Sequence, residues 1–305
     1  MQKRSLISGA FVVTGTVVGA GMLALPTAMS GIWFVPSLAV LGLTWLCMIC
    51  SGLMILEAST HYPLEANFTT IVRDLLGRSW NLINGITLAF VLYIVTYAYI
   101  AVGGDLTQTH FNALLGEGRA LEYWQGQTIF FVVLALCVTL SRALTAQFNM
   151  LLVGGMFVLF LLAVVGLLRH VSLETLLNQQ RLDSAQAPQY WRYVWVALPV
   201  ALTSFGFQST VPSVRQWFAG DNKRTAIAVI LGGGFALAIY ILWQIAIQGN
   251  LPRHAFAPVI AADGQVSVLL QTLAPYLPLA SKIGGWLVWF TYLAIATSFL
   301  GVTLG

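Results

Sequence analysis

The chain alternates between long apolar runs and short polar segments, and this pattern predicts membrane-spanning helices. A helix needs about 20 apolar residues to cross a bilayer. Eight runs reach or approach this length, at residues 6–29, 35–57, 82–102, 128–140, 148–168, 194–218, 226–248 and 283–304. Two shorter segments, 68–76 and 266–273, have apolar residues at helical spacing, which predicts helices that lie along the membrane surface.

The composition supports this interpretation, because 58% of the 305 residues are hydrophobic and only 8% are charged. A soluble domain carries roughly 25% charged residues. So few charges exclude an ordinary soluble enzyme, a disordered chain and a nucleic-acid-binding module. The sequence therefore predicts an all-α polytopic membrane protein, with residues 1–305 forming one transmembrane domain in the lipid bilayer.

Basic residues predict how the chain is oriented in the membrane. They gather in short loops that fall on one side of the predicted spans, at Lys3, Arg4, Arg73, Arg78, Arg142, Lys223 and Arg224. On the opposite side, the loops are longer and their basic residues are mixed with acidic ones. Because short cytoplasmic loops are enriched in Lys and Arg, the N-terminus is predicted to be cytoplasmic.

The first span is unusually rich in glycine, since residues 15–26 read GTVVGAGMLALP. One interpretation is close helix packing, with Gly15 and Gly19 as a small-xxx-small pair. The other is a helix broken near residues 18–22, because glycine and proline both disfavour a continuous helix. A break exposes backbone groups at membrane depth, where free N–H groups bind an anion and free carbonyl groups bind a cation.

The sixth span has the same character. Gly206 lies in its middle among hydroxyl and amide side chains, and Pro212 follows six residues later. Interrupted spans in corresponding positions, here the first and the sixth, favour a five-plus-five inverted repeat with a transporter binding site at the breaks. The first repeat would cover residues 6–168, and an incomplete second repeat residues 191–305. The Gly232–Gly234 run in the seventh span predicts a packing surface or a flexible joint.

Ionisable residues are almost absent from the spans. Glu57 and Asp105 lie near span ends, where they are either interfacial or functional. The four histidines lie in loops without metal-ligand spacing, and no activated nucleophile is evident. The sequence therefore predicts no enzyme, cofactor or metal site. A channel is disfavoured because no span carries a continuous series of polar residues.

Five segments resemble the hydroxy/aromatic amino acid permease family of the amino acid–polyamine–organocation group. They are GTVVGAGMLALP (15–26), SGLMILEA (51–58), AFVLYIVTYAYI (89–100), SFGF with VPS (204–207 and 211–213) and ATSFLGVTLG (296–305). The second and third segments are most similar to tryptophan and tyrosine permeases. The resemblance implies an eleven-span symporter of the bacterial inner membrane, with the LeuT-type five-plus-five fold. It would import an aromatic amino acid together with a proton.

The apolar end at Gly305 predicts a C-terminally truncated member of that family, without its last spans. The alternative is a truncated membrane remnant that does not transport.

The resemblance also implies where the substrate binds. Its carboxylate would meet backbone N–H groups near Gly19 and Gly21, and its ammonium would meet carbonyls near Ser204. Phe207 and Tyr93 would stack on the aromatic ring, and the Gln208 amide would hydrogen-bond an indole or phenol group. The expected substrate-binding set is Gly19, Ala20, Gly21, Met22, Tyr93, Ser204, Phe205, Gly206, Phe207 and Gln208.

The coupling ion would lie beside this set. By analogy with sodium symporters of the same fold, carbonyls of Gly15 and Val18 would meet the hydroxyls of Thr297 and Ser298. Family members often carry a lysine in the fifth span, and alignment through His170 places Met156 there. A thioether cannot carry a proton. Proton coupling remains the expectation from the family, and sodium coupling is the alternative. The sixth span also departs from the family pattern, because Gln208 and Ser209 replace the usual His-Gly.

Overall fold

A computed structural model describes residues 5–19, 21–115, 120–140, 142–177, 190–277 and 282–304, and these ranges are helical with short connections. The α-helices are α1 (Leu6–Val17), α2 (Gly21–Ala28), α3 (Phe34–Thr60), α4 (Phe68–Leu115), α5 (Tyr123–Leu140), α6 (Arg142–Leu168), α7 (Leu173–Leu176), α8 (Tyr190–Ser204), α9 (Val211–Trp217), α10 (Asn222–Gln248), α11 (Ala257–Ala261), α12 (Val266–Leu273) and α13 (Ile283–Leu304). Three 3-10 helices, η2 (Gln208–Thr210), η3 (Arg253–Phe256) and η4 (Ala274–Tyr276), join some of them.

Each of the eight predicted runs contains helix, which confirms the all-α, multi-pass class. Among the described residues, six helices are long and apolar enough to cross a membrane, or seven if the bent pair α1 and α2 forms one span. The helix over the fourth run, α5, is not among these six helices. The number of spans therefore stays a prediction.

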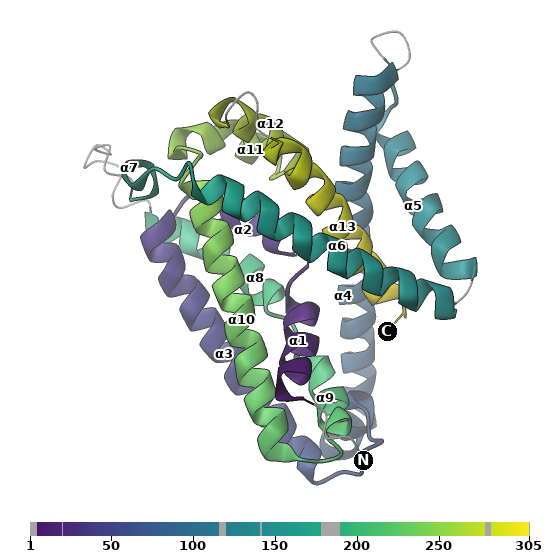
Figure 1. Cartoon of the computed structure of the whole chain (residues 1–305). Helices are drawn as coiled ribbons and strands as arrows, with labels where there is room; N and C mark the ends of the chain where they lie inside the picture. Colours follow the sequence, from purple (N-terminus) through teal and green to yellow (C-terminus); the bar gives the residue numbers. More distant parts are fainter. Residues whose placement is uncertain are drawn as a thin grey trace.

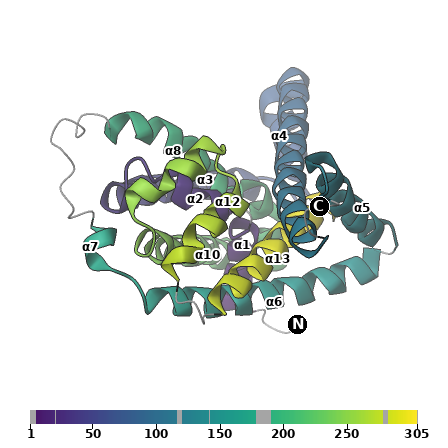
Figure 2. The same ribbon diagram turned by 90° about the horizontal axis from the view of Figure 1, so that it is seen from above.

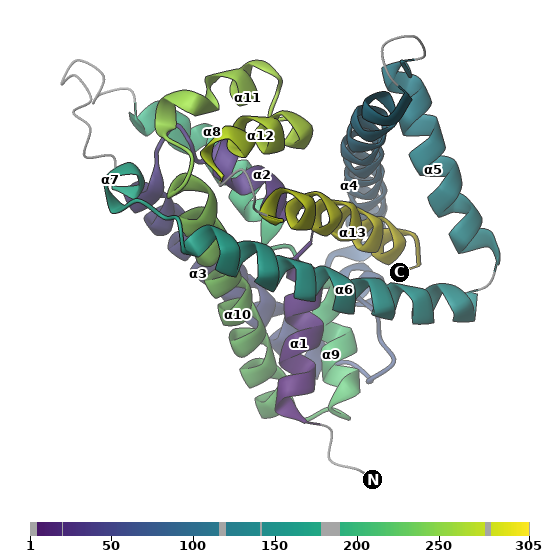
Figure 3. The same ribbon diagram turned by 45° about the horizontal axis from the view of Figure 1, so that its top comes forward.

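The helices form a main bundle with a two-helix arm at its side (Figure 1). In the bundle, α10 packs along both α1 and α3, and α8 with α9 lies against α3. The arm consists of α4 and α5, which pack against each other. The view from above separates this arm from the bundle (Figure 2). Helix α13 packs along α6 and reaches α4, so it connects the two parts (Figure 3).

The two predicted surface helices are both helical. Residues 266–273 form α12, with the predicted bounds. Residues 68–76 form the first part of α4, which runs on into the third span after a break at Gly77. Gly77 has φ of 84°, a left-handed conformation that glycine adopts without steric strain. Whether either helix lies on a membrane surface stays a prediction.

The glycine run of α10 is a packing surface. A Cβ atom at Gly232 would lie 2.6 Å from the Ala10 carbonyl oxygen, and one at Gly233 would lie 2.5 Å from Ile49 Cδ1. A Cβ atom at Gly234 would meet no heavy atom within 4 Å. The Gly232 carbonyl also accepts a hydrogen bond of 3.0 Å from the Thr14 hydroxyl. Two adjacent glycines therefore let α1 and α3 approach α10, while the third faces open space.

We expect Gly232→Ala to destabilise the protein and Gly234→Ala to leave its stability unchanged. The first substitution forces a methyl group into the α1–α10 contact, and such overpacking costs about 1–3 kcal/mol. The second meets no neighbour and gains helix propensity. Thermal unfolding in detergent measures both variants. Equal stability of the two would contradict the close contact between α1 and α10.

Candidate functional site at the two helix breaks

The first span is interrupted, as the second interpretation of its glycines predicted. Helix α1 ends at Val17, and Val18 is extended, with φ of −79° and ψ of 109°. Helix α2 then begins at Gly21, and its axis is bent by 60° from that of α1. Ala20 lies outside the described residues. The break thus brings the carbonyl end of α1 and the amide end of α2 to one place inside the bundle.

The sixth span is interrupted too. Helix α8 ends at Ser204, and helix resumes with η2 and then α9 at Val211. In the connecting segment the Phe205 and Gly206 amides donate to Leu202 O and Thr203 O, at 3.2 and 3.3 Å. These tight turns end α8 where its last carbonyls have no partner within the helix. Both breaks predicted from glycine and proline positions are therefore confirmed.

The two breaks contact each other. The Ser204 hydroxyl lies 3.3 Å from the Gly21 carbonyl oxygen and 2.7 Å from Val200 O, so it can donate to either. A Cβ atom at Gly21 would lie 3.5 Å from Ser204 Cα. The end of α8 therefore lies directly against the first residue of α2, although 183 positions separate Gly21 from Ser204.

Tyr240 of α10 joins the carbonyl ends of both broken helices. Its buried hydroxyl lies 2.8 Å from Val17 O and 2.6 Å from Ser204 O. Its ring packs edge-on against Phe205, with centroids 4.9 Å apart. The last carbonyls of a helix carry partial negative charge and need donors. Tyr240 supplies one donor to two such ends. Nothing in the sequence singled out Tyr240, because it lies in an apolar run without a distinctive motif.

Helix α13 also meets the first break. A Cβ atom at Gly19 would lie only 2.5 Å from the Ser298 hydroxyl oxygen. Tyr99 of α4 hydrogen-bonds the Ser298 side chain, so α4 also reaches this place. Tyr99 is the second residue at the breaks that the sequence did not single out.

Thr297 faces Met156 of α6, with 3.7 Å between its hydroxyl oxygen and the Met156 sulfur. Its hydroxyl also lies 2.8 Å from Leu293 O, within its own helix. The alignment that placed Met156 beside the expected ion site agrees with this contact. Gly15 lies on an exposed part of α1, and a Cβ atom there would meet no heavy atom within 4 Å. The structure thus brings Ser298 to the first break and Thr297 to Met156, but it leaves Gly15 apart.

The other residues expected to bind substrate differ in how deeply they are buried. Met22, Phe205 and Phe207 are fully buried, and the Phe207 ring packs on Gly52 of α3. Gly206 is exposed. Tyr93 is 73% exposed on α4, so the structure does not bring it to the breaks.

Both ends of the Gln208 amide have partners within the protein. Its oxygen accepts from the Phe207 amide at 3.0 Å, and its nitrogen lies 3.4 Å from Met48 O. These contacts fix the segment between α8 and η2. In the structure, Gln208 therefore stabilises the break.

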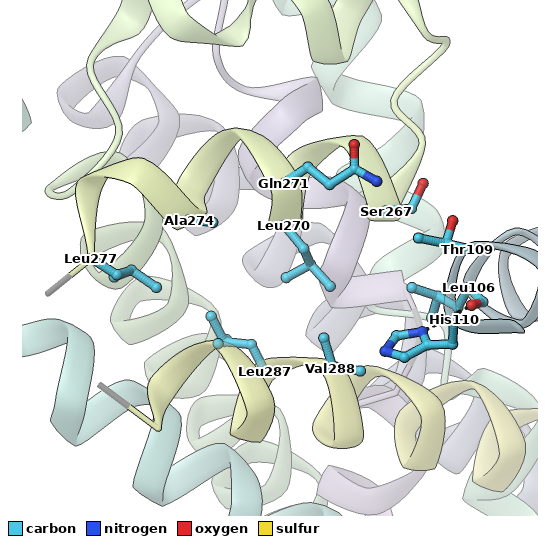
Figure 4. Close-up of a pocket in the computed structure, with 11 residues that line it drawn as sticks. Leu106, Thr109, His110, Ser267, Leu270, Gln271, Ala274, Leu277, Leu287 and Val288 are labelled. Carbon is cyan, nitrogen blue, oxygen red and sulfur yellow. Dashed lines mark hydrogen bonds between the residues drawn. The ribbon is translucent and has the colours of Figure 1, made fainter. Parts of the chain in front are cut away.

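A separate cavity of about 260 Å³ lies between α12, α13 and the end of α4 (Figure 4). Leu270 and Leu287 point into it from opposite walls, and His110 lies at its edge. None of the residues expected to bind substrate lines it. The cavity is mostly apolar, and α12, which forms one of its walls, lies at the end of the bundle opposite the start of α1 (Figure 1).

These features define a multi-pass helical membrane protein with two interrupted helices in contact inside it. The model of the tryptophan/tyrosine permease family matches residues 2–305, and the chain belongs to this family. The resemblance found in the sequence is therefore confirmed. Family membership indicates a transporter and not an enzyme.

Curated relatives align along essentially the whole chain. The tryptophan-specific transport protein of Haemophilus influenzae is 48% identical over 99% of this chain and 72% of the relative. The low affinity tryptophan permease of Escherichia coli strain K12 is 35% identical over 100% of this chain and 72% of the relative. The tyrosine permease of Enterobacter agglomerans is 33% identical over 98% and 71%, respectively.

Proposed function

We propose that the protein imports an aromatic amino acid, tryptophan or tyrosine, across the bacterial inner membrane by ion-coupled symport. The observation that carries this proposal is the contact between the two helix breaks at Gly21 and Ser204. The names of the relatives, which specify tryptophan and tyrosine, support the substrate class. The proposed fold is the five-plus-five inverted repeat, in which the two breaks belong to corresponding spans. The N-terminus would be cytoplasmic.

The charges at the breaks match those of a zwitterionic amino acid. The amide end of α2, near Gly19 and Gly21, carries partial positive charge and attracts the substrate carboxylate. The carbonyl ends of α1 and α8, near Val17 and Ser204, carry partial negative charge and attract the ammonium group. Phe205 and Phe207 follow Ser204 directly, so the ring would lie beside this segment. Movement of the broken helices against the rest of the bundle would alternate access.

The coupling ion is proposed to be a proton, as in the family resemblance, with sodium as the second candidate. Carbonyls near Val18 and the hydroxyls of Thr297 and Ser298 would contribute its ligands. One observation favours sodium: Thr297 meets the thioether of Met156, which is neutral and cannot be protonated. Hydroxyl and carbonyl oxygens can coordinate a hard cation without a titrating group.

Uptake of radiolabelled tryptophan tests this function in cells that lack their own aromatic amino acid permeases. We expect uptake that saturates with tryptophan, is competed by tyrosine and stops when the coupling gradient is abolished. A protonophore and replacement of sodium by choline distinguish the two ions. Flux that rises linearly without saturation would indicate a channel. Absence of uptake, with the protein present in the membrane, would favour the non-transporting remnant.

A further inference from the structure

Asp105 is a buried acidic residue that the substrate site does not use. It lies on α4, and only 7% of its surface is exposed. Its Oδ2 atom is fully buried and has no hydrogen-bond partner among the described residues. Of the two acidic residues near span ends, Glu57 is exposed, as an interfacial position predicts. Asp105 follows the other interpretation, because a buried carboxylate oxygen without a partner in a membrane helix is a functional-site candidate.

Close packing of α4 and α5 explains why Asp105 is buried. A Cβ atom at Gly104 would lie 2.5 Å from Gln127 Cα, and one at Gly126 would lie 2.5 Å from Gly104 O. The two backbones therefore touch one residue before Asp105. Such contact between small residues excludes larger side chains and water from the helix interface.

Tyrosines of two other helices lie near the carboxylate. Tyr123 of α5 and Tyr292 of α13 both interact electrostatically with Asp105. Tyr292 hydrogen-bonds Thr107, and its hydroxyl lies 3.4 Å from Nδ1 of His110. Among the described residues, the titratable groups near Asp105 include these two tyrosines and, one contact further away, a histidine that lines the cavity of Figure 4.

Two helices connect Asp105 and Tyr292 to the first helix break. On α4, Tyr99 contacts Ser298, and Asp105 follows six residues later, ~9 Å along the helix axis. On α13, Tyr292 precedes Ser298 by the same number of residues. Ser298 in turn lies against Gly19. A change in the packing of α4 against α13 at Asp105 is therefore passed through Ser298 to Gly19 at the first break.

We propose that Asp105 binds a second coupled cation, a sodium ion or a proton, between α4, α5 and α13, apart from the ion proposed beside Val18, Thr297 and Ser298. An unpaired buried carboxylate is unfavourable by several kcal/mol, and a bound cation removes that penalty. The tyrosine hydroxyls of α5 and α13 supply neutral oxygen atoms around it. Occupancy holds α4 against α13 and so fixes Ser298 beside Gly19, where the substrate binds. The assignment rests on the proposed function, because this cation is coupled to the same transport.

The test uses Asp105→Asn in proteoliposomes with two assays. Exchange of labelled for unlabelled tryptophan needs no ion gradient, and accumulation against a gradient needs coupling. We expect exchange to stay within about twofold of the wild type and accumulation to fall at least about tenfold, within the usual range of coupling energies. Asp74→Asn is the matched control, because Asp74 is an exposed carboxylate on the same helix, and its Oδ2 accepts from the Tyr62 hydroxyl at 2.8 Å. It should leave both assays unchanged.

Imposed sodium and pH gradients, applied separately to the wild type, identify the cation. Normal accumulation by Asp105→Asn would overturn the proposal. Loss of exchange by the folded variant would also overturn it, since Asp105 would then be needed for substrate movement itself. Absence of exchange in the wild type would instead overturn the proposed function, and this assignment with it.

A second variant keeps the test decisive if Asp105→Asn does not fold. Tyr292→Phe keeps the ring contact with His110, whose centroid distance is 5.5 Å, and removes only the hydroxyl. We expect it to raise the ion concentration for half-maximal accumulation about fivefold. An unchanged ion dependence would contradict the site.

Discussion

Gly19→Leu is expected to reduce concentrative uptake of tryptophan strongly. Ser298 can rotate away from a methyl group, because only its hydroxyl oxygen lies within 3 Å of the Cβ position at Gly19. The remaining atoms of leucine have to displace α13 or fill the space at the break where the substrate carboxylate is proposed to bind. Overpacking of this kind costs about 1–3 kcal/mol. That energy corresponds to a loss of affinity of about 5- to 150-fold.

Gly42→Leu provides the matched control for this substitution. Gly42 lies in α3, another membrane helix, and a Cβ atom there would meet no heavy atom within 4 Å. The control measures the effect of placing leucine in a helix without a close contact. Uptake is normalised to the amount of protein in the membrane. Similar uptake by the two variants would show that the first break does not bind substrate.

Tyr240→Phe is expected to weaken both the stability of the protein and its affinity for substrate. The variant retains the ring that packs on Phe205 but loses the hydroxyl shared by Val17 O and Ser204 O. A buried carbonyl that loses its donor costs about 1–3 kcal/mol. The two helix ends are then free to separate, so the partial charges proposed to hold the ammonium group no longer converge.

Thermal unfolding in detergent and equilibrium binding of labelled tryptophan measure the two effects. Tyr276→Phe is the control, because it removes a hydroxyl group from a side chain that is 43% exposed. We expect the control to match the wild type in both assays. If Tyr240→Phe also matched the wild type, the hydroxyl would not hold the broken helices together.

The two helix breaks could be predicted because their causes are local in sequence. Glycine and proline disfavour a continuous helix whatever surrounds them. The glycines at 15, 19 and 21 therefore predicted the turn at Val18, and Gly206 with Pro212 predicted the end of α8. The contact between Gly21 and Ser204 followed only from the comparison of corresponding spans.

The partners of these breaks could not be predicted, because side-chain direction depends on tertiary packing. Residues 89–100 contain three tyrosines in an apolar run, and nothing local distinguishes them. The structure exposes Tyr93, which the family resemblance favoured, and brings Tyr99 to Ser298. Tyr240 also lies in an apolar run, and no local motif distinguishes it. Gln208 was expected to meet substrate, but its amide is used by Met48 and the Phe207 backbone.

The role of Asp105 could be predicted from the sequence only in part. Its position near a span end allowed an interfacial or a functional role. The adjacent Gly103 and Gly104 were the available signal for close packing, since small residues allow helices to touch. Their partners, Phe130, Gly126 and Gln127, come from a helix whose distance from α4 the sequence does not reveal.

The central claim is that an aromatic amino acid binds where the two breaks meet. Photo-crosslinking tests it most directly, with a diazirine derivative of phenylalanine, competition by tryptophan, and mass spectrometry of the labelled peptides. We predict competed labelling near Val18–Met22 and Ser204–Gln208. Competed labelling confined to the cavity around Leu270 and Leu287, or to the exposed face of α4 around Tyr93, would contradict the account.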